Sequence, residues 1–425
     1  MTYKEFLKKE SAGLAMTEVL DRINAASSGT ALVYTHDDPD GLTAGIILKR
    51  FLESRNIRVV MKIPTVMELE KERLARDVAG LKPDIVFVVD KATMGYYDEY
   101  AQIHSNIIVI DHHPLLGQEL KKILVVNPVL GGYKRCSASF VAHMLAASAG
   151  FSGAALDIAS LIGLKGDWAV EPATEDISDY VRPFYDEVKE KYRWLFRHIS
   201  SRPTMFEVKQ REKTTLLNQI AEIVFALGGG GFQYFYNGRD GELKDITTGE
   251  FAFKNLEGWL SKYKEVSTEE DFIKALPEAA KASKIFGYYL SDWNCTMELM
   301  KNSIFAATAK DTDIYLFMGS NVKLMPMAGS VALYRLPAAS SDTLFIMVSE
   351  MGESGVHFSF RSRNGKIHCG NFAHDLALSM QKKFQSDKIT GGGHPFAAEC
   401  RTRQRLPFHA VMTEFFDVFG KITKE

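Results

Sequence analysis

Cysteine pairs, long apolar runs and a strong net charge are all missing from this sequence of 425 residues. Its four cysteines (Cys136, Cys295, Cys369, Cys400) show no CxxC spacing, which argues against a zinc cluster, and we interpret them as structural thiols of a reducing compartment. No segment reaches about 18 uninterrupted apolar residues, and the first residues lack the apolar core of a signal peptide. The sequence therefore predicts a cytoplasmic protein without a membrane partner.

The net charge of -2 excludes a global basic field of the kind that attracts nucleic acid over a whole surface. Any such partner must be held locally. Between Arg361 and Arg405, nine Lys and Arg residues stand against three acids. This excess indicates either a phosphate-facing surface or a solvated basic face.

Short β-branched apolar runs alternate with helical patterns through the first 170 or so residues. Such near-continuous apolar strands predict an α/β fold with a mostly parallel sheet and helices on both of its faces. Ligands of these folds collect at the carboxyl ends of the strands. The predicted strands are TALVYT (30–35), RVVMKI (58–63), DIVFVVD (84–90), NIIVIDHH (106–113) and ILVVNP (123–128).

Acids and histidines gather at or just beyond these strand ends. His36, Asp38 and Asp40 occupy alternate residues, so in an extended segment they would point to one side and Asp37 would point away. The other members are Asp90, the pair His112 and His113, and Asp167 in LIGLKGDW. Taken alone, HDDPDG fits a turn as well as it fits a metal site, and IDHHP fits a strand end with two surface histidines. Asp90 and Asp167, taken singly, fit helix caps or surface acids better than metal ligands.

Converging carboxylates and imidazoles with no lysine or arginine among them would repel one another in the absence of cations. Such a mixed ligand set suits Mn²⁺ or Mg²⁺, and a shared carboxylate can hold two ions about 3.5 to 4 Å apart. The joint placement at strand ends therefore favours a site for two divalent ions.

The remaining chain predicts a helical connection and a second domain. Apolar spacing from Ile177 to Ile199 predicts one long amphipathic helix, and 214–227 predicts another that ends in the glycine run 228–231, interpreted as a C-cap and hinge. The predicted domains are 1–175 (catalytic), 176–231 (helical linker), 232–300 (inserted segment) and 301–425 (a smaller α/β domain ending in a helix). The inserted segment is rich in aromatic residues, which could form a small core or a partner surface: Phe232, Tyr234, Phe235, Tyr236, Phe251, Phe253 and Trp259.

A set of short motifs resembles the DHH phosphoesterase superfamily in its DHHA1-containing branch. The motifs are THDDPDG at 35–41, VVD at 88–90, IDHH at 110–113, GDW at 166–168 and, far downstream, GGGH at 391–394. Within this superfamily the chain is most similar to archaeal RecJ-like exonucleases, including those associated with the replication complex GINS. The resemblance implies a DHH domain, a DHHA1 substrate-binding domain, and possible roles in DNA repair and replication.

The same resemblance assigns roles residue by residue. One metal ion would be held by His36, Asp38 and Asp90, and a second by Asp40, Asp90, His112 and Asp167, with Asp90 bridging them. His113 would stabilise or protonate the phosphoryl oxygens, and Asp111 would orient the histidines. Substrate contacts would come from the second domain, from Arg361, Arg363, Gly391, Gly392, Gly393 and His394, since glycines let backbone N–H groups approach a phosphate.

One departure leaves the substrate open. Many bacterial RecJ-type sequences carry aspartate where this chain has His36, whereas small phosphatase and pyrophosphatase branches carry histidine. The favoured function is a two-metal exonuclease that releases nucleoside monophosphates from single-stranded DNA or RNA, with Mn²⁺ ahead of Mg²⁺. The alternatives are a small-substrate phosphodiesterase acting on oligoribonucleotides, cyclic dinucleotides or a nucleoside bisphosphate, and an interaction protein that binds GINS-like replication factors.

Overall fold

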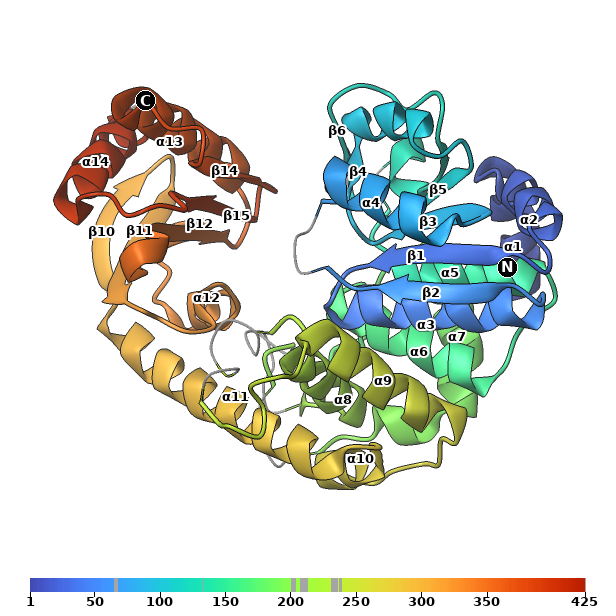
Figure 1. Ribbon diagram of the computed structural model, residues 1–425. Coiled ribbons are helices and arrows are strands. Elements are labelled where there is room, and N and C mark those ends of the chain that lie inside the picture. The colour runs from blue at the N-terminus through green and yellow to red at the C-terminus, as the bar shows by residue number, and fades with distance from the viewer. Residues whose placement is uncertain are drawn as a thin grey trace. The chain divides into compact units, whose positions relative to one another are not determined.

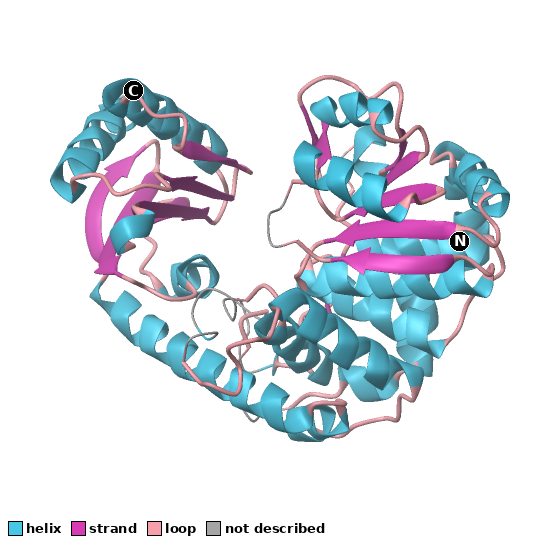
Figure 2. Ribbon diagram, in the orientation of Figure 1, coloured by secondary structure: helices cyan, strands magenta, loops and turns pink. Residues whose placement is uncertain are grey.

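The computed structural model describes residues 1–64, 68–132, 134–199, 204–206, 213–230, 236 and 239–424 (Figures 1 and 2). The chain forms two compact units, Met1–Gly287 and Tyr288–Glu425. Helix α11 (Ala279–Leu299) carries the chain from the first unit into the second. No helix among the described residues is both long enough and apolar enough to span a membrane.

The first unit is built on a five-stranded sheet in the order β2-β1-β3-β5-β7, with every pairing parallel. All five strands lie within the predicted runs, and their side chains are mostly buried because helices cover both faces of the sheet. The predicted fold class is confirmed. The strands are β1 (Thr30–Thr35), β2 (Arg58–Lys62), β3 (Ile85–Val89), β5 (Ile107–Ile110) and β7 (Leu124–Val126).

Helices pack on each face of this sheet (Figure 1). On one face, α4 (Lys71–Leu81) and the 3₁₀ helix η1 (Gly95–Gln102) share a buried apolar cluster with β1, β3 and β5. On the other face lie α3 (Pro39–Ser54), α5 (Ala138–Ser148) and α6 (Ala154–Gly166), which also pack against one another. Outside this layer, α1 (Tyr3–Gly13) packs on α5, and α2 (Met16–Ala25) follows it.

The prediction of one helix from Ile177 to Ile199 is wrong. Ile177 ends the short strand β9 (Asp176–Ile177), α7 covers only Arg182–Lys191, and a 3₁₀ turn follows at Arg193–Phe196. Pro183 favours a helix start because it has no N–H to donate, and Tyr192 leaves the helical region with φ −121° and ψ 43°. The apolar spacing was correct only for the middle of the segment.

Helix α8 (Leu216–Leu227) is buried along nearly its whole length and packs on α6. It ends at Gly228, as predicted, although Gly228 has φ −99° and not a left-handed backbone. The fourth glycine of this run, Gly231, lies outside the described residues.

The segment after the glycine run belongs largely to the first compact unit. Helix α9 (Thr248–Ser261) packs against α3 and α8, and α10 (Glu269–Ala275) also contacts α8. Of the seven aromatic residues named in the sequence analysis, Tyr236, Phe251, Phe253 and Trp259 are buried, whereas Phe232, Tyr234 and Phe235 lie outside the described residues. The division into two compact units does not test whether 232–300 is an inserted segment. The four predicted domains therefore stay a prediction.

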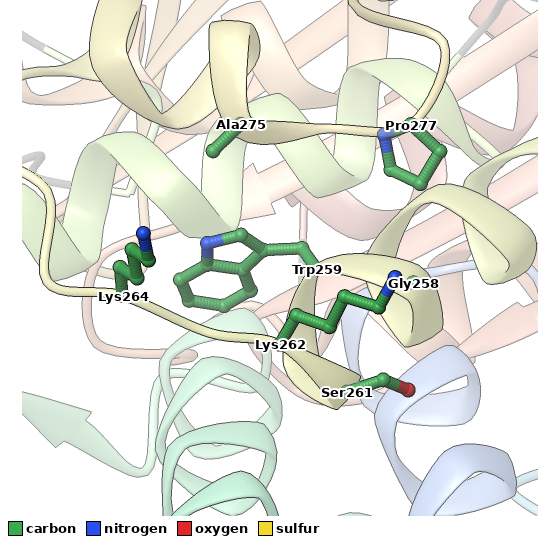
Figure 3. A pocket seen from close by; sticks show the side chains of 7 residues that line it. All are labelled: Gly258, Trp259, Ser261, Lys262, Lys264, Ala275 and Pro277. Carbon is green, nitrogen blue, oxygen red and sulfur yellow. The ribbon is translucent and has the colours of Figure 1, made fainter.

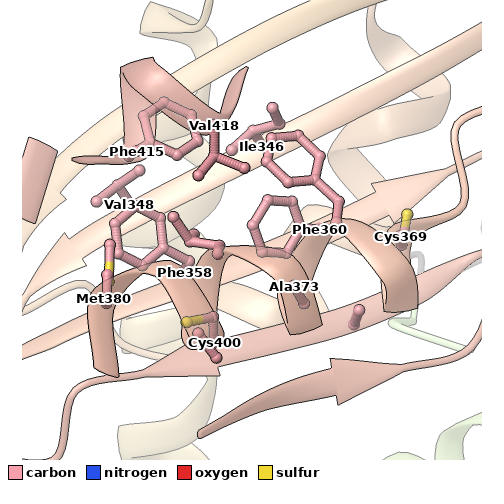
Figure 4. Close-up of a cluster of buried hydrophobic side chains, with 14 of the residues drawn as sticks. Ile346, Val348, Phe358, Phe360, Cys369, Ala373, Met380, Cys400, Phe415 and Val418 are labelled. Carbon is pink, nitrogen blue, oxygen red and sulfur yellow. The ribbon is translucent and has the colours of Figure 1, made fainter. Parts of the chain in front are cut away.

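The second unit holds a six-stranded sheet in the order β10-β11-β12-β13-β15-β14, in which only the β11–β12 pair is parallel. The predicted second α/β domain is confirmed. Helices α13 (Cys369–Phe384) and α14 (Phe408–Lys424) share one apolar core with the sheet (Figure 4), while α12 (Met325–Ala332) contacts β12 and β13. The strands are β10 (Ile304–Ala309), β11 (Thr312–Ser320), β12 (Asp342–Glu350), β13 (Val356–Ser362), β14 (Thr390–Gly393) and β15 (Ala397–Arg401).

Candidate metal centre

The register of the parallel sheet brings three sequence motifs to one edge. Thr35 pairs with Val89, and Val89 pairs with Ile110, so the ends of β1, β3 and β5 lie in a row. The chain leaves these ends through His36, Asp90 and Asp111. Asp90 adopts a left-handed backbone with φ 52°, which aspartate tolerates better than most residues do.

A first group of candidate ligands comprises His36, Asp38 and Asp90, which offer atoms within 4.8 Å of one another. The Nδ1 atom of His36 lies 3.0 Å from Asp38 Oδ2 and 3.9 Å from Asp90 Oδ2. Asp38 is the N-cap of α3, and its Oδ1 accepts a hydrogen bond from Gly41 N at 2.9 Å. Helix capping therefore fixes the orientation of this carboxylate.

A second group comprises Asp40, His112 and Asp167. His112 Nε2 lies 2.9 Å from Asp167 Oδ2 and 3.7 Å from Asp40 Oδ2. Asp167 is the C-cap of α6, so it arrives from a helix end and not from a strand. Asp40 lies in the first turn of α3, so the expectation that 36, 38 and 40 project from one extended segment is wrong for this residue.

The buried carboxylate of Asp40 is held from a distant part of the chain. Its Oδ2 accepts a hydrogen bond from Ala138 N at 2.6 Å and its Oδ1 accepts one from Ser139 N at 2.8 Å, both in the first turn of α5. The positive end of a helix dipole favours a carboxylate at this position. Two backbone donors thereby set the direction in which Asp40 faces His112.

A third group joins Asp90 to His112 and His113, so Asp90 is shared between two groups of candidate ligands. His112 Nε2 lies 3.4 Å from Asp90 Oδ1. The Nδ1–H of His113 donates to Asp111 Oδ1 at 2.8 Å, and Asp111 Oδ2 accepts a hydrogen bond from Thr93 Oγ1 at 2.6 Å. Asp111 therefore orients His113 directly.

The donor atoms of this cluster fit divalent cations. Four buried atoms, His36 Nδ1, Asp90 Oδ1, His112 Nε2 and Asp167 Oδ2, have no hydrogen-bonding partner of acceptable geometry among the described residues. Buried polar atoms are rarely left unsatisfied in proteins. Their mixture of imidazole nitrogen and carboxylate oxygen is the ligand set of Mn²⁺ and related ions. Two cations, one held by the first group and one by the second, would satisfy all four atoms.

The comparisons with known proteins agree with this centre. Residues 30–163 match the model of the DHH family, N-terminal domain. Residues 30–163 therefore form a DHH-family N-terminal domain. An uncharacterized protein of Methanocaldococcus jannaschii is 29% identical over 153 residues, which is 34% of each of the two chains. The match therefore spans about a third of that relative.

Solved structures resemble this chain over nearly its whole length. The DHH domain of a member of a ribosomal protein family gives a TM-score of 0.63 at 14% identity, covering 98% of this chain and 91% of that one. Exonuclease RecJ bound to manganese gives 0.60 at 15% identity, covering 96% and 94%. RecJ from Thermus thermophilus in complex with Mn²⁺ also gives 0.60, at 16% identity, covering 99% and 55%. Likeness at these identities establishes the fold.

In the absence of cations, burial and neighbouring charges raise the pKa values of three groups in the centre. Burial alone would lower the pKa of His36, but the charges of Asp38, Asp37 and Asp90 outweigh it and raise this pKa to about 9. Burial, together with the charge of Asp38, raises the pKa of Asp90 to about 6. Burial also raises the pKa of Asp40, with Asp167 and Asp90 adding to the effect. Cations and protons therefore compete for the same atoms.

This competition predicts that the melting temperature of the metal-free protein falls as the pH rises, whereas the stabilisation by added metal increases. The raised pKa of His36 contributes stability that is present below its unfolded pKa of about 6.5 and is lost as the pH rises toward 9. Ionisation of Asp90 acts in the same direction near pH 6. In EDTA we expect the melting temperature to fall by at least about 3 °C from pH 6.5 to pH 9. Over the same interval, the increase in melting temperature caused by added Mn²⁺ should become larger.

Calorimetry at constant ionic strength would measure both trends. His36→Gln removes the titrating imidazole and is expected to flatten the fall in EDTA. A melting temperature in EDTA that stays constant or increases over this interval would contradict the assignment of the protons to the centre.

The structure places a lysine side chain next to the acids of the centre, and the sequence analysis did not include it. Lys91 follows Asp90, its side chain is fully buried, and its Nζ donates to Pro64 O at 3.1 Å. Burial lowers its pKa to about 8, against the attraction of Asp37, Asp90 and Asp38. The expectation of no lysine or arginine near the acids is therefore wrong, and Lys91 offsets part of their repulsion.

Glycines also support the centre. Gly229 N donates to Asp37 O at 2.7 Å, and a Cβ on Gly228 would lie 2.2 Å from the same oxygen. The turn after α8 thus backs the loop that carries His36 and Asp38. Asp37 is itself buried in this contact, with its Oδ1 3.6 Å from His36 Nε2. The glycine run is visible in the sequence, but only its contact with Asp37 shows that it supports the metal-binding loop.

The predicted substrate residues all lie in the second unit, and the structure separates their roles. Arg361 is buried, and its guanidinium donates to Ser330 Oγ at 3.0 Å and Phe360 O at 2.8 Å. Arg363 donates to Leu333 O at 2.7 Å and Leu336 O at 2.9 Å. Both arginines therefore make structural contacts within this unit, and a role in substrate binding stays a prediction.

The three glycines of the GGGH motif also differ in their surroundings. A Cβ on Gly391 would lie 2.2 Å from Ala373 O, and a Cβ on Gly393 would lie 2.6 Å from Ala397 O. Packing thus requires these two glycines, whereas a Cβ on Gly392 would meet nothing within 4 Å. His394 is exposed beside them. Of the three glycines, only Gly392 has open space in the direction of a Cβ.

A cavity of about 500 Å³ lies apart from the metal ligands, at the end of α9 and the end of α10. Figure 3 shows the indole of Trp259 with the side chains of Lys262 and Lys264 around it. Neither an acid nor a histidine is among the described residues that line this cavity. It is therefore unsuited to hold a metal ion.

Proposed function

We propose that this DHH protein is a metal-dependent phosphodiesterase, and that its substrate is the end of a single-stranded nucleic acid. The observation that carries the proposal is the shared position of Asp90 between two groups of candidate ligands. Four buried donor atoms without hydrogen-bonding partners among the described residues support the presence of cations. We assign His36, Asp38, Asp40, Asp90, His112 and Asp167 as ligands of two divalent ions, with Mn²⁺ preferred and Mg²⁺ possible.

When bound, divalent cations would withdraw charge from a phosphoryl oxygen and lower the pKa of a water molecule. The chain positions the other groups. Burial lowers the pKa of His113, but the neighbouring carboxylate of Asp111 outweighs it and raises this pKa, which favours the protonated ring. His113 is therefore suited to stabilise or protonate a phosphoryl oxygen from Nε2, while Asp111 holds its Nδ1–H.

We choose an exonuclease because of the similarity in fold to solved structures, and not because of the geometry of the metal centre. The solved structures that share the fold include an exonuclease bound to manganese. We therefore favour stepwise release of nucleoside monophosphates over hydrolysis of a small substrate. Contacts from Arg361, Arg363, the glycine motif and His394 to the strand belong to this proposal, and the GINS-like partner also stays a prediction.

End-labelled single strands would test the activity. Labels on the 5′ or the 3′ end of DNA and RNA, each with Mn²⁺ or Mg²⁺, report hydrolysis and its direction together. We expect labelled mononucleotide to appear from one end of a single strand and not from a blunt duplex. Hydrolysis confined to a dinucleotide would favour the small-substrate phosphodiesterase, and no hydrolysis of any strand would leave an interaction protein as the better explanation.

A further inference from the structure

Phe396 is an apolar side chain left on the surface of the second unit, with 53% of its area exposed. It lies in the turn between β14 and β15, directly after the glycine motif. Exposed aromatic residues of this size are common at binding sites, because one flat apolar face is available for contact.

The backbone around Phe396 is fixed. Ser362 N donates to Phe396 O at 2.9 Å, and His394 N donates to Ala397 O at 2.8 Å across the turn. Cys369 N also donates to Pro395 O at 3.0 Å. The side chain is therefore presented from a rigid base, which reduces the entropy lost when a ligand binds.

Other exposed aromatic side chains among the described residues have partners. The rings of Tyr96, Phe305 and Phe416 lie 5.2 Å from Tyr97, 5.6 Å from Tyr315 and 5.1 Å from Phe415, respectively, and Arg363 lies 5.5 Å from the ring of Tyr334. Within the described part of the chain, no ring or cation contacts Phe396 in this way. Its edge lies against Gly365, where an added Cβ would come within 3.1 Å of the ring.

The polar groups near this ring are already engaged. Lys366 Nζ forms an ion pair with Asp311 at 2.7 Å, and Arg363 donates to backbone carbonyls. At the start of α13, Cys369 N and Gly370 N donate to carbonyls of the same turn. This helix end is therefore not an anion site. The surface here offers the flat apolar face of Phe396, and the described donors named above form no phosphate site next to it.

We propose that Phe396 is a stacking platform for one base of a single-stranded nucleic acid. The proposal rests on the function proposed above and adds a specific contact in the second unit. Every nucleobase has a flat face that can stack on an aromatic ring, and such stacking tolerates any sequence. Because the contact involves no charge, its contribution to binding should not depend on salt, unlike contacts to phosphates.

Binding of a fluorescent oligothymidylate to the full chain in EDTA, which prevents cleavage, tests the platform. Phe396→Leu keeps an apolar side chain but removes the aromatic face, and Phe396→Tyr keeps that face. We expect roughly tenfold weaker binding for the leucine variant, by the same factor at about 50 and about 200 mM salt. The tyrosine variant and the control Phe416→Leu, another exposed phenylalanine, should bind within about twofold of the unchanged protein.

A second measurement distinguishes the loss of stacking from misfolding of the leucine variant. Phe396→Trp is expected to bind normally, and stacking should quench the added indole fluorescence. Normal binding by the leucine variant, or a loss that disappears at the higher salt, would overturn the platform while leaving the nuclease proposal intact. Binding through Phe396 without hydrolysis of any strand would contradict the nuclease alone. A protein with no affinity for single strands would overturn both.

Discussion

Replacing Asp90 with asparagine is expected to reduce strand hydrolysis by more than about 1,000-fold and to release bound cation. Asp90 Oδ1 lies 3.4 Å from His112 Nε2, and its Oδ2 lies 3.9 Å from His36 Nδ1, so one side chain connects two candidate ligand groups. Asparagine keeps the shape and tolerates the left-handed backbone, but it removes the negative charge. The loss would therefore be chemical and not conformational.

Cleavage of labelled strands and metal content by mass spectrometry measure the two effects together. Asp84→Asn is the matched control, because Asp84 precedes the same strand at its opposite end and accepts a hydrogen bond from Thr30 N at 2.7 Å. We expect this control to keep its metal and its turnover. An Asp90→Asn protein that retains both would show that the shared carboxylate is not a bridge.

Gly163→Ala is expected to destabilise the protein and weaken metal binding, although alanine normally stabilises a helix interior by about 0.5–1 kcal/mol relative to glycine. A Cβ at this position of α6 would lie 2.1 Å from Ser139 Oγ, 2.6 Å from Thr43 Oγ1 and 2.7 Å from Asp40 Oδ1. The added methyl group would force α6 away from α3 and α5 and displace Asp40. We expect a loss of about 1–3 kcal/mol in the free energy of unfolding.

Denaturant unfolding in EDTA, followed by titration with Mn²⁺, separates stability from metal affinity. Gly80→Ala in α4 is the control, because nothing lies within 4 Å of an added Cβ there. This control should be neutral or stabilised by up to about 1 kcal/mol. Unchanged stability and unchanged Mn²⁺ affinity in the Gly163→Ala protein would exclude close packing of α6 as the support of Asp40.

The order of strands and motifs determined much of the centre before any packing was known. Each of the three central apolar runs is followed by an acid or a histidine, and parallel strands place their carboxyl ends on one edge. His36, Asp90 and Asp111 could therefore be brought together from the sequence. The local pattern also predicted the second α/β domain and its terminal helix, α14, since alternation and helical spacing are properties of neighbouring residues.

The tertiary structure alone decided how these groups are held. Asp40 is fixed by amides of Ala138 and Ser139, about a hundred residues away in the chain, and Asp167 arrives from the end of a helix packed at Gly163. Arg361, predicted as a substrate contact, bonds to groups within its own unit. Such contacts depend on which surfaces meet when helices pack on a sheet. Spacing along the chain records the faces of each element, but not the distant atoms that those faces will touch.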